Sequence, residues 1–101
     1  MIIFNTTFHV DISEAKNLVI YLHEVYIPQA TESGILQNGR LCRIISSQSE
    51  NAESFSVQFE TENTSTLHKW YGECGRTLSD NINKAFKGKV QGFSTIMEII
   101  D

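Results

Sequence analysis

The chain has 101 residues, a formal net charge of −4 at pH 7, 41% apolar residues and 20% charged residues. This length suits one hydrophobic core, so we expect residues 1–101 to form a single domain. No apolar run approaches the ~20 residues of a membrane span. The 8 Lys and Arg residues are scattered, which argues against nucleic-acid binding.

The N-terminus and the rare residue types give further expectations. Met1–Asn5 lacks the basic region and the long apolar run of a secretory signal, so we expect a cytoplasmic protein. Cys42 and Cys74 have no C-x-x-C spacing and are expected to be reduced packing residues. The histidines lack the pair spacing of a zinc site, so we expect no metal and no cofactor.

The first half of the chain reads as strand, helix, strand. Residues Ile2 to Val10 alternate, with Ile2, Phe4, Thr6, Phe8 and Val10 on one face. Asp11 is a typical helix cap, Pro28 predicts a kink or a restart, and Gly34 predicts the end of the helix. The apolar face of that helix is predicted as Ala15, Leu18, Val19, Leu22, Val25 and Tyr26. Leu36 to Ser47 is predicted as the second strand.

The second half repeats this order. A polar turn over Ser47 to Ala52 precedes a strand over Ser54 to Glu62, with Phe55, Val57 and Phe59 facing inward. Asn63, Thr64 or Ser65 can cap a helix that ends at Gly88, and Val90 to Ile100 is the last predicted strand. The predicted apolar face of this helix is Leu67, Tyr71, Cys74, Leu78, Ile82 and Phe86, with Trp70 at its edge. Gly72 and Gly75 suggest that another group packs closely against their turn.

The order β-α-β-β-α-β predicts a ferredoxin-like α+β fold, in which a four-stranded antiparallel sheet carries both helices on one face. The other sheet face is left uncovered. It should carry Ile3, Asn5, Thr7, His9, Ser56, Gln58 and Glu60 and, where the register is not fixed, Leu41, Arg43, Ile45, Ile96, Glu98 and Ile100. This mixture is too apolar for full exposure and too polar for a core, so we expect a homodimer formed through this face.

The candidate site residues follow from the same alternation. Asn5, His9, Arg43 and Glu60 are polar residues expected on the uncovered face, where they are candidates for a ligand-binding pocket. The alternative is that they satisfy one another across the interface and fix its register. His68 and Trp70 belong to Leu67–Tyr71, which can line the mouth of a pocket, although packing is the commoner role of such an aromatic residue.

Several segments together resemble an uncharacterised bacterial family known only as a domain of unknown function. They are Phe4–His9, Glu24–Pro28, Arg40–Ile44, Leu67–Tyr71 and Gly92–Glu98. The resemblance implies the fold and brings no activity with it.

More remotely, the layout resembles the dimeric α+β barrels, in which two sheets face each other. Some members are cofactor-independent oxygenases, and some degrade haem with an asparagine of the first strand, a tryptophan and a histidine. Asn5 can match that asparagine. Trp70 and His68 are two residues apart on one helix and point about 200° apart, so they do not match the other two.

The sequence therefore favours a homodimeric module that is non-enzymatic or binds a small molecule. The alternative is a small cofactor-independent oxygenase or isomerase, with haem degradation disfavoured. No nucleic-acid or membrane partner is expected.

Overall fold

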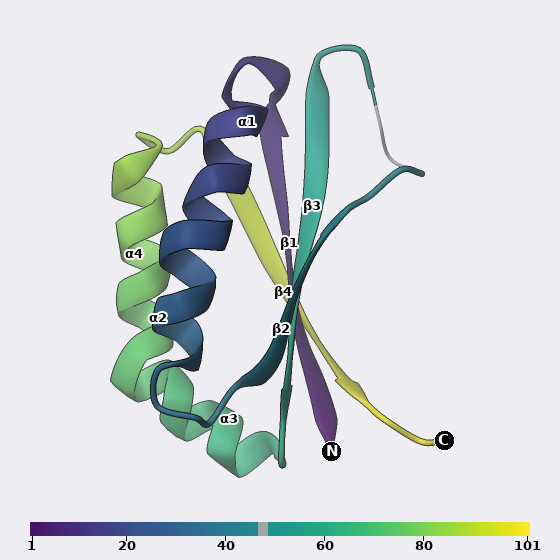
Figure 1. The fold of residues 1–101 in the computed structure, drawn as a ribbon, viewed down its shortest axis with the longest axis vertical. Helices are drawn as coiled ribbons and strands as arrows, with labels where there is room; N and C mark the ends of the chain where they lie inside the picture. Colours follow the sequence, from purple (N-terminus) through teal and green to yellow (C-terminus); the bar gives the residue numbers. More distant parts are fainter. Residues whose placement is uncertain (47–48) are drawn as a thin grey trace.

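The computed structural model describes residues 1–46 and 49–101. The elements follow the predicted order β-α-β-β-α-β, with each long helix divided by a π-helical turn (Figure 1). They are β1 (Ile2–Asp11), α1 (Ile12–Tyr21), the π-helical turn η1 (Leu22–Tyr26), α2 (Ile27–Thr31), β2 (Gln37–Arg43), β3 (Ala52–Thr61), α3 (Thr64–Trp70), the π-helical turn η2 (Tyr71–Gly75), α4 (Arg76–Ala85) and β4 (Val90–Glu98).

The four strands form one antiparallel sheet in the order β2-β3-β1-β4. All helices lie on one face of this sheet, and the opposite face carries no element of the described chain (Figure 1). The predicted ferredoxin-like fold is therefore confirmed. We call the bare surface the open face. None of the helices in the described ranges is long and apolar enough to span a membrane.

The core fills the space between the sheet and the helices with aromatic and aliphatic side chains. Alternation on β1 and β3 is as predicted, because Phe4, Phe8, Phe55 and Phe59 are all buried on the helix face. Edge-on aromatic contacts join the layers, with ring centroids of Phe4 and Trp70 5.6 Å apart and those of Phe8 and Tyr26 5.7 Å apart.

The first long helix begins at the predicted cap and passes through Pro28. The Asp11 carboxylate accepts a hydrogen bond of 3.0 Å from the Ser13 N–H. The expected interruption takes the form of the turn η1, where the Ile27 N–H donates to the Leu22 carbonyl five residues back. Pro28 lacks an N–H, and it lies directly after a turn whose hydrogen bonds already depart from the α-helical pattern.

The second long helix corrects one prediction. A reciprocal pair of hydrogen bonds between Asn63 and Thr66 caps it. Tyr71 was predicted on the core face with Trp70 at its edge, but Trp70 is 1% exposed and Tyr71 is 44% exposed. The turn η2 is the reason, because a π-helical turn holds one residue more than an α-helical turn and shifts the buried positions.

The prediction that another group packs closely against Gly72 and Gly75 is confirmed at Gly75 only. Gly75 lies against the Trp70 ring, so closely that an added Cβ would overlap it. Nothing lies within 4 Å of the position that a Cβ on Gly72 would take.

The register of the outer strands corrects the expected membership of the open face. Leu41 pairs with Val57 and Arg43 with Phe55, so both lie on the helix face. On β4, Ile96 pairs with Phe4 and Glu98 with Ile2, which places them on the helix face as well. The open face of β4 instead carries Phe93, Thr95 and Met97. Ile45 and Ile100 lie outside the strands.

The strand ends also differ from the predicted ones. β2 ends at Arg43 rather than Ser47, and β4 ends at Glu98 rather than Ile100. Of the predicted turn over 47–52, residues 47 and 48 lie outside the described residues. The rest turns as expected, with the Ala52 N–H donating to the Ser49 hydroxyl at 3.1 Å.

Candidate ligand-binding site

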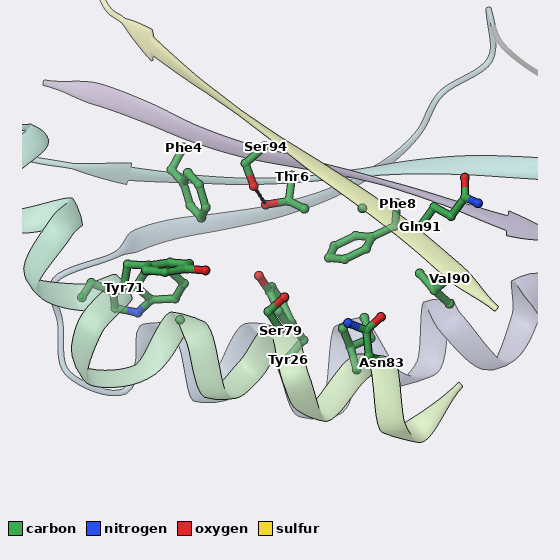
Figure 2. A pocket seen from close by; sticks show the side chains of 14 residues that line it. Phe4, Thr6, Phe8, Tyr26, Tyr71, Ser79, Asn83, Val90, Gln91 and Ser94 are labelled. Atoms are coloured by element: carbon green, nitrogen blue, oxygen red, sulfur yellow. Dashed lines mark hydrogen bonds between the residues drawn. The ribbon is translucent and has the colours of Figure 1, made fainter. Parts of the chain in front are cut away.

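A cavity of about 380 Å³ lies on the helix side of the sheet, between β1 and β4 above and η2 and α4 below (Figure 2). Many of its β4 and α4 residues are exposed, so it opens to solvent between these two elements. Its walls are Phe4, Thr6, Phe8, Tyr26, Trp70, Tyr71, Gly75, Ser79, Ile82, Asn83, Val90, Gln91, Gly92 and Ser94.

Small side chains create this space. The wall includes the small residues Gly75 and Ser79 on the helix side and Gly92 and Ser94 on β4. A side chain at position 92 would crowd the core, because a Cβ on Gly92 would lie 3.1 Å from Cδ1 of Phe8. A volume of this size is within the usual range for a small-molecule pocket, about 300–1,000 Å³.

Neutral hydrogen-bonding groups occupy the middle of the cavity. The Thr6 and Ser94 hydroxyl oxygens are 3.1 Å apart and hydrogen-bonded. Ser79 and Asn83 lie one turn apart on α4, and Figure 2 shows both directed towards the sheet. Tyr26 lines the same cavity. These groups can donate to or accept from a hydroxyl, carbonyl or amide of a ligand.

Burial raises the pKa of Tyr26 to about 12, while a hydrogen bond with Thr6 acts in the opposite direction. The phenol is therefore a neutral donor at physiological pH. No Asp, Glu, Lys, Arg or His is among the residues that line the cavity in the described chain. The site thus has neither a countercharge for an ionic ligand nor a residue with the usual titration range of a general base.

A smaller groove of about 170 Å³ adjoins the cavity. It is lined by Phe4, Thr64, Leu67, His68, Tyr71 and Ile96, so Phe4 and Tyr71 belong to both hollows.

Three of the predicted site residues lie on the open face but do not converge. Asn5 accepts a hydrogen bond from the Ser56 hydroxyl, and His9 Nδ1 is 2.9 Å from the Ser54 hydroxyl. The Glu60 carboxylate accepts a hydrogen bond of 3.2 Å from Asn38. Asn5 and His9 are four residues apart on one strand, roughly 13 Å at the usual rise. These polar groups find partners within their own chain.

A small depression lies on the open face. This depression of about 60 Å³ touches Glu60, together with residues of β1, β2 and β3, but neither Asn5 nor His9. The structure therefore does not assemble the predicted polar residues into one pocket.

The other three candidates lie on the helix side of the sheet. Arg43 was expected on the open face, but its guanidinium lies 5.6 Å from the Phe55 ring centroid, and its Nε is 3.2 Å from the Glu53 carboxylate. Trp70 is a core residue whose indole N–H donates to the Ala30 carbonyl at 2.9 Å, although it also forms part of the cavity wall. His68 is exposed at the adjoining groove. Asn5 and Trp70 lie on opposite sides of the sheet, so the two side chains do not contact the same ligand within one chain.

Sequence reasoning missed the polar residues of the cavity. Thr6 stands between Phe4 and Phe8 on the apolar face of β1, and Ser94 pairs with it across the sheet. Ser79 and Asn83 directly follow the core residues Leu78 and Ile82. A polar side chain inside an otherwise apolar face was the signal, most plainly at Thr6.

The architecture defines the class: a ferredoxin-like α+β protein with a cavity between its sheet and its helices. Residues 1–100 match the family described as Domain of unknown function (DUF4286), and the chain belongs to this family. The sequence-based resemblance to an uncharacterised family is thereby confirmed.

Solved structures share the fold across nearly the whole chain. A candidate antibiotic biosynthesis monooxygenase from Deinococcus radiodurans has a TM-score of 0.72 at 20% identity, covering 100% of this chain and 94% of its own. HapK from Hahella chejuensis has a TM-score of 0.71 at 10% identity, covering 99% of this chain and 93% of its own. A dimeric ferredoxin-like protein from an uncultured marine organism has a TM-score of 0.63 at 14% identity, with 100% of both chains covered. Among curated proteins none matches the chain.

Proposed function

We propose that this protein is a cytoplasmic homodimer that binds a small uncharged molecule in the cavity between β4 and α4. The observation that carries the proposal is the composition of the cavity wall. Aromatic rings surround a group of neutral hydrogen-bonding side chains, and no acidic or basic side chain is present in the described wall. Such a wall fixes the orientation of a neutral ligand through a few polar contacts and derives affinity from apolar contact.

The homodimer is supported by the open face. Phe93 is 62% exposed and Met97 is 38% exposed on this face, beside the polar row of β1 and β3. Two structurally similar proteins from uncultured marine organisms are described as dimeric ferredoxin-like proteins. A second copy placed on the open face would cover these side chains.

A second candidate function is a cofactor-independent oxygenase acting on the same ligand. It is favoured by the fold shared with a candidate antibiotic biosynthesis monooxygenase, which has a TM-score of 0.72. The cavity supports it less well, because a reaction that starts with proton removal needs a base that titrates near neutral pH. Tyr26, with a pKa of about 12, does not supply one. We therefore place binding ahead of catalysis.

A screen of small uncharged aromatic alcohols, ketones and amides by amide NMR tests the proposal. Hits should shift the signals of Ser79, Asn83 and Gly92. Ser79→Leu, which places an apolar side chain in the cavity, should weaken these hits at least about tenfold, as expected for a lost hydrogen bond and a blocked volume.

Thr77→Leu makes the same kind of change on an exposed position of α4 outside the cavity and should leave binding unchanged. The proposal is wrong if no compound binds, or if hits bind equally well to the Ser79→Leu protein. Consumption of oxygen with conversion of a bound hit would instead support the oxygenase.

A further inference from the structure

The cavity and the groove meet at two aromatic rings. Phe4 and Tyr71 line both the hollow of about 380 Å³ and the hollow of about 170 Å³. Figure 2 shows Phe4 reaching from the sheet towards Tyr71 at one end of the cavity. Tyr71 is 44% exposed, and the Arg76 guanidinium lies 5.8 Å from its ring centroid. The side chains of Phe4 and Tyr71 thus separate the cavity from the groove, and Tyr71 lies on the surface.

The two hollows differ in chemistry. The cavity presents the hydroxyls of Thr6, Ser79 and Ser94 together with the amide of Asn83. The floor of the groove is formed by Phe4, Leu67 and Ile96, with Thr64 and His68 also lining it. A molecule that matches both has a hydrogen-bonding head and an apolar arm.

The groove also leaves apolar surface uncovered. Ile96 is 55% exposed, on the helix face of β4 and therefore away from the open face where a second copy would lie. Apolar area that is exposed to water is unfavourable. An apolar arm in the groove would cover Ile96 and the edge of Tyr71, continuous with a head held in the cavity.

Charge sets a further condition on the ligand. Across both hollows, His68 is the one acidic or basic side chain among the described lining residues, and it is exposed to solvent. A carboxylate, phosphate or ammonium held among Thr6, Ser79, Asn83 and Ser94 would find no charged side chain in the described cavity wall.

We propose that the cavity and the groove form one extended site for an uncharged amphiphile, a hydroxyl- or carbonyl-bearing ring with a hydrocarbon arm. The ring lies among Thr6, Ser79, Asn83 and Ser94, and the arm passes Phe4 and Tyr71 to lie on Leu67 and Ile96. This rests on the proposed function, because it names the class of ligand for the same cavity.

Three probes test the extended site by amide NMR titration: resorcinol, 4-hexylresorcinol and the anion 4-hexylbenzoate. Resorcinol carries the head alone, and 4-hexylresorcinol adds the arm. We expect 4-hexylresorcinol to bind at least about tenfold more tightly than resorcinol, because its methylenes leave water. It should shift signals of Leu67 and Ile96 as well as those of Ser79 and Asn83. The anion should bind at least about tenfold more weakly than 4-hexylresorcinol.

Ile96→Gln should remove the gain from the arm while leaving resorcinol binding unchanged. Ile12→Gln is the matched control, since Ile12 is 52% exposed and lines neither hollow. Equal affinity of the two resorcinols, or an undiminished gain in Ile96→Gln, would overturn the extended site. Tight binding of the anion would overturn the requirement for an uncharged ligand.

The two proposals fail in different ways. If resorcinol and 4-hexylresorcinol bind equally and Ser79→Leu abolishes both, the cavity proposal holds and the extended site is wrong. If the probes leave all these signals unmoved, the extended site is wrong, and the screen described above decides separately about the cavity.

Discussion

Tyr26 connects the two layers of the molecule through a single buried side chain. Its ring packs edge-on against Phe8, and the residue is 5% exposed. Burial raises the pKa of its phenol to about 12, so the folded protein binds this proton more tightly than the unfolded chain, with its ordinary value of 10.0. A raised folded-state pKa gives a contribution to stability that is complete below pH 10 and is lost as pH rises through about 12.

The free energy of unfolding should therefore fall across this range. We expect a loss of about 2–3 kcal/mol between pH values just below 10 and just above 12, in addition to the contribution of other groups. Tyr26→Phe should lack this component. Urea unfolding of both proteins as a function of pH measures the difference. A constant difference between wild type and variant across the range would contradict the proposed environment of Tyr26.

At the scale of single residues, part of the site could be predicted and part could not. Trp70 and His68 were singled out from an aromatic cluster, and both line a hollow. Asn5, His9 and Glu60 were placed on the correct face, but alternation does not reveal that they bond to Ser56, Ser54 and Asn38 of their own chain. Ser79 and Asn83 line the cavity because the sheet and α4 are separated beside them. Hydrophobic periodicity does not reveal where two layers of a fold are separated.

At the scale of elements, Gly75 makes the clearest prediction. Gly75→Ala puts a methyl group into the Trp70 ring, with Cε3 and Cη2 of Trp70 each 2.9 Å from the new Cβ. Trp70 is 1% exposed and its N–H is bonded to Ala30, so the ring has little freedom to move away. We expect a loss of about 1–3 kcal/mol in the free energy of unfolding by chemical denaturation.

Gly72→Ala is the matched control in the same turn. Nothing lies within 4 Å of its added Cβ, so the gain in helix propensity should leave stability unchanged or raised by up to about 1 kcal/mol. Equal destabilisation by the two substitutions would show that backbone conformation, and not contact with Trp70, governs this turn.

The element predictions were reliable where apolar and polar residues alternate clearly along a strand. β1 and β3 alternate sharply, and their faces were predicted correctly. β2 and β4 carry apolar residues at both alternating positions, so alternation left the faces of Leu41, Ile96 and Glu98 open, and Arg43 was expected on the wrong face. All four lie on the helix face. The phase of the second helix was wrong at Trp70 and Tyr71, because a periodicity of 3.6 residues has no place for a π-helical turn.

At the scale of the whole molecule, the open face predicts the oligomeric state. Light scattering should give twice the chain mass of 11.4 kDa. Phe93→Lys introduces a charge on the open face and should give a monomer, whereas Ile12→Lys, on α1, should remain dimeric. A wild-type protein that stays monomeric over a wide concentration range would refute the homodimer.

The turn η2 lets the second helix hold one additional residue without changing which side chains of α4 face the sheet. A π-helical turn corresponds to an α-helix with one residue inserted, and it rotates the helix back by roughly the 100° that one residue adds. In the second helix this rotation lets Trp70 stay buried before the turn while Ser79 and Asn83 face the sheet after it. A relative that lacks one residue in Tyr71–Gly75 would form a regular α-helix there and still point Ser79 and Asn83 at the sheet, because seven residues make about two α-helical turns. The turn η2 therefore accommodates one additional residue while the same side chains of α4 line the cavity.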